Sequence, residues 1–157
     1  MLIQFQNYLS LESIYFWSNL GVLPFWFLLI LIPNARITQI FVNSIIIPLM
    51  LASSYSYVFY QTILSEVPIL EFFTLYLSLE DLYTIFSSDS FLLLFWLHFL
   101  ALNLFLGSWV SRDGVKYNMP RGLVFIPLIL IYFTGPIGLV LYWLARVFYA
   151  KKLGFHD

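Results

Sequence analysis

The sequence contains no cysteine among its 157 residues, which excludes disulfides, thiolate catalysis and cysteine-ligated metal sites. Charged residues are also scarce. They make up 10% of the chain, against about 25% in a typical soluble domain. Too little polar surface is left to cover a water-soluble fold of this size. The formal net charge is −1 and there is no basic run, so nucleic acid is not an expected partner.

Apolar residues are abundant instead: 62% of the chain is hydrophobic and 21% is aromatic, with a mean hydropathy of +0.91. This composition predicts an integral membrane protein whose first partner is the lipid bilayer. Met1–Asn7 carries no basic run and no arginine- and serine-rich character, so neither a secretory signal nor a transit peptide is expected. We therefore expect a bacterial or organelle-encoded chain, or one that has already been processed.

Four segments reach the roughly 20 residues that a helix needs to cross a bilayer, namely residues 14–32, 37–64, 91–110 and 122–149. Pro48 interrupts the second segment, and Pro136 predicts a kink in the fourth. The strand alternation of a membrane barrel is missing. The predicted fold is therefore an all-α membrane protein, with four transmembrane helices in a single domain over residues 1–157.

Residues 66–88 connect the second and third spans and carry a polar stripe at helical spacing, made of Glu71, Thr74, Ser78 and Asp81. The stripe predicts an amphipathic interfacial helix on the bilayer surface, or one that begins at Ser78 as N-cap. Interfacial helices usually carry basic residues, and this segment is acidic. A lid over a cavity and a docking surface for a partner are therefore the alternatives.

The basic residues are divided almost equally between the two sides of the membrane, so the positive-inside rule gives little preference for either orientation. If the chain has four spans, four basic residues lie on one side of the membrane, namely Arg36, Arg112, Lys116 and Arg121. Three lie on the other side, namely Arg146, Lys151 and Lys152. The connection from Ser65 to Ser88 holds no basic residue. This lack of basic residues favours an orientation in which the loop at Arg112 faces the cytoplasm or stroma.

The third span contains a histidine and an asparagine, His98 and Asn103, to which lipid cannot hydrogen-bond. Asn103 shares one helical face with Trp96 and Gly107, where Gly107 lets a neighbouring helix approach and Asn103 bonds across the contact. His98 lies about 140° around the helix from Asn103. Three roles are open for His98: a buried interhelical contact, an acid–base group, or an axial ligand to a tetrapyrrole. No ligand pair at zinc spacing accompanies it.

The fourth span carries small and polar residues four positions apart, at Thr134, Gly138, Tyr142 and Arg146. Such a stripe either lines a cleft that ends in a charge or lets two helices pack closely. The third span ends in Arg112 and Asp113 at the bilayer edge. There an arginine commonly anchors the helix, and an aspartate before glycine commonly forms a turn.

Together these residues form a pattern that resembles the ABA-deficient-four-like family, whose best-known members are plant neoxanthin synthases. The likeness extends over most of residues 14–149. It is carried by Trp96, His98, Leu100, Ala101, Asn103, Leu104, Phe105, Gly107 and Trp109, then Arg112 and Asp113, then Gly135, Pro136, Ile137, Gly138, Leu139, Leu141 and Tyr142. The family usually has an aspartate where this chain has Asn103. Asparagine has nearly the same size as aspartate but lacks its carboxylate.

The resemblance implies a carotenoid-related role, conversion of an epoxy-xanthophyll to its allenic isomer without net redox change. Such a reaction needs an acid for the epoxide oxygen and a base for a carbon-bound proton. We predict His98 for one role and Asp113, or else Glu71, for the other. The predicted ligand-binding residues are Trp96, Asn103, Gly107, Arg112, Thr134, Gly138, Tyr142 and Arg146.

No metal and no cofactor is required by this prediction, and the expected bound molecule is a carotenoid, a chlorophyll or a lipid. The alternative function is a non-catalytic accessory subunit of a larger photosynthetic or respiratory membrane complex. A small transporter or channel component is disfavoured, because no charge lies deep in any span. The expected location is a plastid membrane, thylakoid or envelope, or a bacterial inner membrane.

Overall fold

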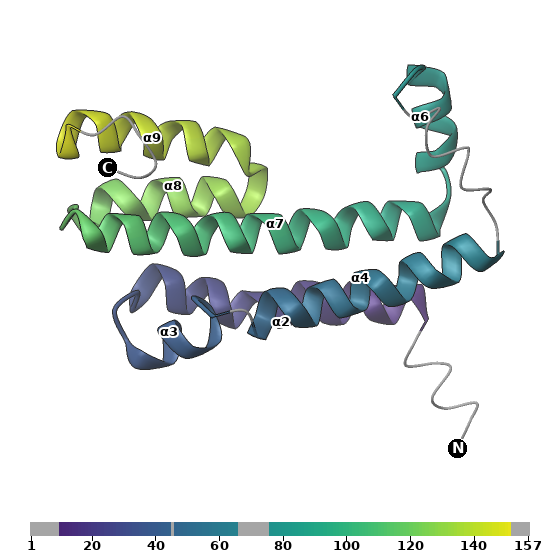
Figure 1. The fold of residues 1–157 in the computed structure, drawn as a ribbon, viewed down its shortest axis with the longest axis horizontal. Helices are drawn as coiled ribbons and strands as arrows, with labels where there is room; N and C mark the ends of the chain where they lie inside the picture. The colour runs from purple at the N-terminus through teal and green to yellow at the C-terminus, as the bar shows by residue number, and fades with distance from the viewer. Residues whose placement is uncertain (1–9, 45, 66–75, 152–157) are drawn as a thin grey trace. The chain divides into compact units, whose positions relative to one another are not determined.

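The computed structural model describes residues 10–44, 46–65 and 76–151. Within these residues the chain is helical and has no strand, as the composition predicts (Figure 1). The helices are α2 (Leu11–Leu31), α3 (Arg36–Phe41), α4 (Ile46–Ser65), α6 (Leu79–Phe86), α7 (Asp89–Lys116), α8 (Arg121–Thr134) and α9 (Pro136–Ala150).

Two of these helices, α2 and α7, are long and apolar enough to cross a membrane by length and composition. They correspond to the first and third predicted spans. α7 has 28 residues and is therefore about 42 Å long, which exceeds the roughly 30 Å of the hydrocarbon core. Its ends carry the charges of Asp89 and Lys116, and charged groups are well accommodated at a membrane edge.

The second predicted span, residues 37–64, is not one helix. α3 ends at Phe41 and α4 begins at Ile46, so the break precedes Pro48. The proline lies in the first turn of α4, where a missing backbone N–H has no intrahelical partner to lose. In α4 the hydroxyl groups of Ser53, Ser54, Ser56 and Thr62 donate to carbonyl groups one turn earlier in the same helix, a bonding pattern that satisfies them without an external partner.

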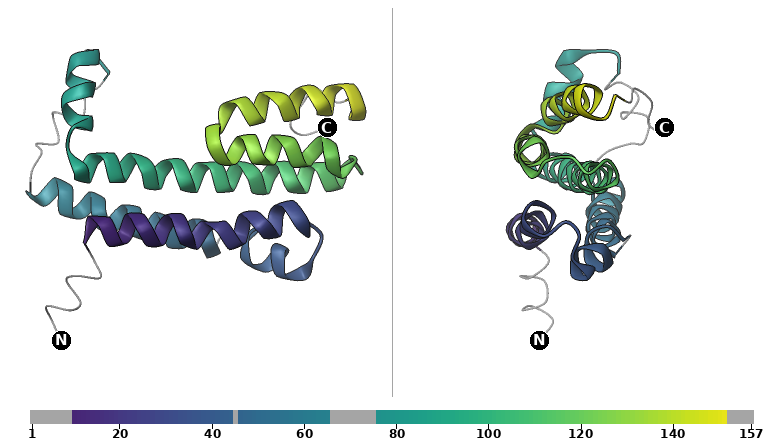
Figure 2. Two further views of the ribbon diagram at one scale, coloured as in Figure 1. Left: turned by 180° about the vertical axis from the view of Figure 1, so that it is seen from behind. Right: turned by 90° about the vertical axis from the view of Figure 1, so that its left-hand side faces the viewer.

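The fourth predicted span, residues 122–149, is a helical hairpin rather than one kinked helix. α8 ends at Thr134, Gly135 has φ 63° and ψ −87°, and α9 starts at Pro136. Glycine adopts this conformation without the Cβ clash that other residues meet, and a proline fits the first position of a new helix. The chain therefore reverses, and α9 lies alongside α8 (Figures 1 and 2).

The chain divides into two compact units. Unit 1 comprises Met1–Leu20 and Leu49–Phe99, and unit 2 comprises Gly21–Pro48 and Leu100–Asp157. The core of unit 1 is made by one face of α7 and by α4, and its buried residues are Val58, Leu93, Leu94 and Leu97. In unit 2 the buried Thr38 donates its hydroxyl to the carbonyl oxygen of Ile32 at 2.7 Å, which fixes the turn between α2 and α3.

The predicted interfacial segment is represented by α6, which belongs to unit 1. Ser78 is its N-cap, as predicted, and accepts hydrogen bonds from the backbone of Glu80 and Asp81. Residues 66–75, which include Glu71 and Thr74, lie outside the described residues. Of the four residues of the predicted polar stripe, only Ser78 and Asp81 are therefore among the described residues.

Candidate functional site

A buried ion pair connects α7 and α9 in unit 2. Arg146 Nε lies 2.8 Å from Asp113 Oδ2, and the two side chains are 0% and 7% exposed. Tyr142 donates its hydroxyl to the same carboxylate oxygen at 2.7 Å. Arg146 also donates from Nη2 to the hydroxyl of Tyr117 at 3.3 Å and lies over the Tyr117 ring. Both charges are therefore compensated and hydrogen-bonded, as burial requires.

Helical spacing explains how the sequence builds this cluster. Gly138, Tyr142 and Arg146 form the buried face of α9. At Gly138 a Cβ would collide with the backbone of Ile131 and Pro127 on α8, so only glycine allows the two helices to pack this closely. The predicted stripe is therefore correct for these three residues, and it serves helix packing.

Thr134, the first member of the predicted stripe, is separated from the other three. It is the last residue of α8, it is exposed, and its hydroxyl donates to the carbonyl oxygen of Leu130 in its own helix at 2.7 Å. The chain reversal at Gly135 is the reason, because spacing across a turn no longer places residues on one face. Arg112 is also exposed, although its neighbour Asp113 is buried.

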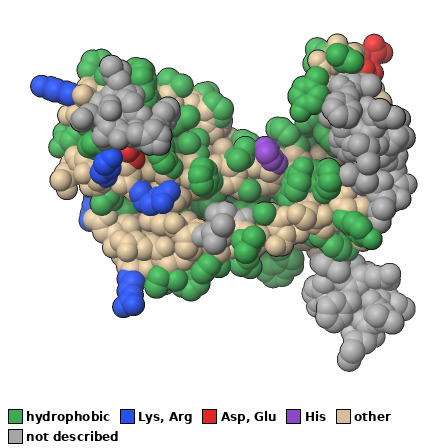
Figure 3. All heavy atoms as spheres, viewed as in Figure 1, with side chains coloured by type: hydrophobic (Ala, Val, Ile, Leu, Met, Phe, Trp, Pro, Cys, Tyr) green, Lys and Arg blue, Asp and Glu red, His purple; other side chains and the backbone are tan. Residues whose placement is uncertain are grey.

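The hairpin changes the distribution of charge. Tyr149 near the end of α9 donates to the carbonyl oxygen of Asn118, in the connection between α7 and α8, at 3.2 Å. Arg146 and Lys151 therefore belong to the same end of unit 2 as the loop at Arg112, not to the opposite side as the four-span prediction has it. In Figure 3 the Lys and Arg side chains gather at this end.

His98 lies in unit 1 and is exposed rather than buried between helices. It lines a groove of about 600 Å³ whose walls are largely aromatic, with Tyr55, Phe59, Phe86, Phe91 and Phe95 among its residues. The ring centroids of His98 and Tyr55 are 6.2 Å apart. The groove is thus apolar with a polar pair, an arrangement typical of small-molecule sites.

The two residues predicted as an acid–base pair, His98 and Asp113, are not brought together. Both lie on α7, and their fifteen-residue separation corresponds to about 22 Å along the helix axis. Groups at that distance do not act on one epoxide and its adjacent carbon, since proton transfer needs hydrogen-bond reach. Asp113 is moreover already bonded to Arg146 and Tyr142.

Asn103 is 6% exposed and lies against Gly135, where a Cβ would meet its side-chain oxygen. Its Nδ2 has no hydrogen-bond partner within residues 10–44, 46–65 and 76–151. The amide therefore packs under the turn of the hairpin. A charged aspartate in this place would be more costly to bury than the neutral amide.

Trp96 and Gly107 both contact α2, as their shared helical face predicts. In unit 1, Trp96 donates from its indole N–H to Oδ1 of Asn19 at 3.0 Å. In unit 2, Gly107 is covered by the indole ring of Trp26, which a Cβ would meet at 2.6 Å. These contacts hold helices together.

Sequence reasoning missed three partners of the predicted residues. Tyr117, which binds Arg146, stands four positions after Asp113, a spacing that places both on one helical face. Tyr55 beside His98 and Trp26 over Gly107 lie on other helices, and no spacing along the chain relates them. In the described part of the chain, no three His, Asp or Glu side chains gather to hold a metal ion.

No curated protein and no solved structure matches the chain significantly. The description of a protein family does match, over residues 13–142. The matched range includes His98, Asn103 and Asp113, whereas Arg146 lies beyond it. Since the match covers well over half of the 157 residues, the chain belongs to the ABA DEFICIENT 4-like family.

Proposed function

We propose that this protein is an integral membrane protein that binds an epoxy-xanthophyll and isomerises its epoxide end group to an allene. The observation that carries the proposal is the aromatic groove around His98, in a chain of a family whose best-known members act on such pigments. A groove of about 600 Å³ is within the usual range for small-molecule sites. It accommodates one end of a long polyene, while the remainder of the molecule lies in lipid.

In the proposed membrane arrangement α2, α4 and α7 span the bilayer and the α8–α9 hairpin enters and returns on one side. α2 and α7 have the required length and composition, whereas α4, with 20 residues, has the required length alone. α8 and α9 have 14 and 15 residues, about 21 and 22 Å, so neither crosses a 30 Å core alone. The groove at His98 is then open to lipid, the source of the substrate.

The proposed chemistry uses two side chains of unit 1. The C–O bond of the epoxide breaks as the Tyr55 hydroxyl protonates the oxygen. His98 removes a proton from the adjacent polyene carbon, and the electrons of that C–H bond form the second double bond of the allene. The proton on the imidazole then returns to the tyrosinate through solvent or directly, so atoms and electrons balance without a co-reactant.

The test is expression of the full chain in cells that accumulate violaxanthin, followed by chromatography and absorption spectra of the extracted pigments. We expect a new allenic xanthophyll with the natural sequence. His98→Ala should lower its yield about 100-fold, which is the lower range for loss of an acid–base group. Tyr55→Phe should lower it as well, because the ring stays and only the hydroxyl is lost.

The matched control is Phe105→Ala, a variant of an exposed α7 residue outside the groove, which should leave the yield unchanged. Absence of any new xanthophyll with the natural sequence overturns the isomerase proposal. A product that persists unchanged in both His98→Ala and Tyr55→Phe overturns the assigned roles.

A second candidate is a non-catalytic subunit that holds pigment or lipid in a larger membrane complex. It is favoured by the chemistry of unit 2, where Asn103 replaces a carboxylate and Asp113 is engaged by Arg146 and Tyr142. Purification in mild detergent and an absorption spectrum separate the two functions. Co-purified pigment and partner subunits without any conversion support this candidate; a pigment-free chain without partners contradicts it.

A further inference from the structure

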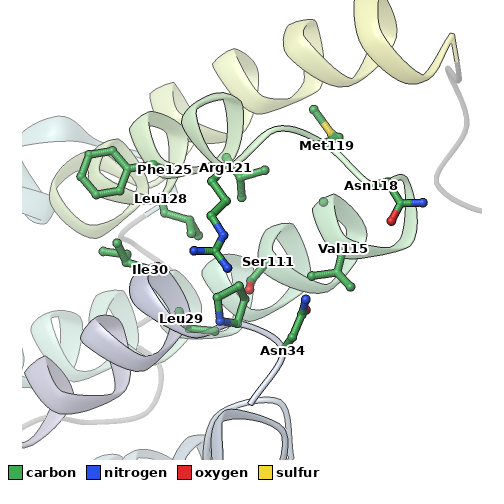
Figure 4. Close-up of a pocket in the computed structure, with 13 residues that line it drawn as sticks. Leu29, Ile30, Asn34, Ser111, Val115, Asn118, Met119, Arg121, Phe125 and Leu128 are labelled. Carbon is green, nitrogen blue, oxygen red and sulfur yellow. The ribbon is translucent and has the colours of Figure 1, made fainter.

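A cavity of about 230 Å³ lies in unit 2, between the end of α2, the end of α7 and the beginning of α8 (Figure 4). One wall is apolar and contains Leu29, Phe125 and Leu128. The cavity's polar lining residues are Asn34, Ser111, Asn118 and Arg121. The cavity thus combines apolar and polar lining, and no carboxylate is among the described residues that line it.

Ser111 supplies an unsatisfied hydrogen-bonding group to this cavity. The residue is 2% exposed, and its hydroxyl has no partner within the described residues. A buried hydroxyl without a partner is unfavourable, so a partner from outside the described residues is expected at this place.

Arg121 provides the positive charge. Figure 4 shows its guanidinium group extending across the cavity toward Ser111. It is the first residue of α8, and no side chain caps this helix. The N–H groups at a helix N-terminus favour an anion. The guanidinium therefore favours negative charge in the cavity that Ser111 also lines, and the uncapped start of α8 at Arg121 adds positive potential nearby.

We propose that this cavity binds the phosphate group of an anionic lipid. Arginine and a helix N-terminus recognise phosphate oxygens, the Ser111 hydroxyl donates to one of them, and the apolar wall receives the first part of an acyl chain. The volume is below that of sites for whole drug-sized molecules, so it suits a headgroup rather than a pigment. The site lies at the basic end of α7, beside Arg112 and Lys116, where anionic headgroups are attracted.

The test measures binding of phosphatidylglycerol to the full chain in uncharged detergent micelles, with phosphatidylcholine and inorganic phosphate as the other probes. We expect phosphatidylglycerol to bind at least tenfold more tightly than phosphatidylcholine, and inorganic phosphate not to displace it at equal concentration. Arg121→Gln should weaken phosphatidylglycerol binding about tenfold, and Arg121→Lys should weaken it less because the charge is kept. Ser111→Ala should weaken it severalfold.

Arg112→Gln is the matched control, because it removes an exposed charge of the same end without touching the cavity, and it should change the affinity less than twofold. Equal losses in Arg121→Gln and Arg112→Gln overturn the proposal in favour of unspecific attraction to a basic surface. Displacement by inorganic phosphate overturns it in favour of a soluble anion. Where Arg121→Gln fails to fold, an unchanged affinity in both Ser111→Ala and Asn34→Ala overturns it.

Discussion

Arg146 is the largest fully buried side chain of the described residues, and its position on an apolar helix makes its charge costly without compensation. Asp113 and Tyr117 supply that compensation, and Tyr142 on α9 donates in turn to the Asp113 carboxylate. A buried pair of this kind adds little stability over an apolar replacement, but its disruption is costly because the remaining charge is left alone. The cluster therefore locks α9 to α7 in one register.

Replacing one partner of this pair should be strongly destabilising. Asp113→Asn keeps the shape and leaves the guanidinium without a counter-charge, so the free energy of unfolding should fall by about 3–5 kcal/mol. Thermal unfolding of the detergent-purified chain, followed by circular dichroism, measures the loss. Arg112→Gln, at the neighbouring exposed position, should change it by less than about 0.5 kcal/mol.

The double variant Asp113→Leu with Arg146→Met removes both charges and should recover most of the stability lost in Asp113→Asn. A stability of Asp113→Asn equal to that of the natural sequence would show that the ion pair has no structural role.

Among the helices, three glycines differ in what surrounds them. At Gly138 a Cβ would meet backbone atoms of α8, and at Gly107 it would meet the far end of the Trp26 side chain. At Gly21 nothing lies within 4 Å of the added atom. Backbone cannot move aside without separating the helices, whereas an indole ring can shift. Gly138 and Gly107 therefore test two different contacts between helices, and Gly21 serves as the position without such a contact.

Substitution of each glycine by alanine should change the free energy of unfolding by a different amount. Gly138→Ala should lower the free energy of unfolding most, by about 3 kcal/mol, and Gly107→Ala by about 1 kcal/mol, the two ends of the usual range for overpacking. Gly21→Ala should stabilise α2 by about 0.5–1 kcal/mol through helix propensity. The same thermal unfolding measurement applies. A harmless Gly138→Ala would mean that α8 and α9 are not in contact.

At the scale of the whole molecule, the charged residues are divided unevenly between the two units. Each described basic residue belongs to unit 2, while unit 1 carries Glu12, Glu80, Asp81 and Asp89. α7 itself runs from Asp89 at its start to Lys116 at its end. In the proposed arrangement of three spans and a returning hairpin, the positive-inside rule predicts that the basic end faces the cytoplasm or stroma.

The absence of cysteine makes this arrangement directly measurable by labelling of single introduced cysteines in oriented vesicles. Lys116→Cys and Lys151→Cys should react with a membrane-impermeant maleimide from the same side, because α9 returns beside α8. Tyr83→Cys on α6 should react only from the other side. Labelling of Lys116→Cys and Lys151→Cys from opposite sides would contradict the hairpin and restore four complete spans.

Some of the relations between the candidate residues could be predicted from their spacing along the sequence alone. The i, i+4 pattern correctly joined Gly138, Tyr142 and Arg146 on one face, and the shared face of Trp96 and Gly107 correctly predicted contact with a neighbouring helix. The pairing of Arg146 with Asp113 was not predicted, because each residue was assigned to a different side of the membrane. That assignment followed from reading Gly135–Pro136 as a kink within one helix.

The sequence by itself determined the helical class, the apolar character, the family and the positions of α2 and α7, since these depend on composition and on periodicity along a single segment. The tertiary structure decided the reversal at Gly135, the burial of Asp113 with Arg146, the exposure of His98 in an aromatic groove, and the cavity at Ser111 and Arg121. These depend on which helices meet. A reversal of the backbone at one residue changes the contacts of every residue that follows it, and the local sequence pattern does not predict whether the chain reverses.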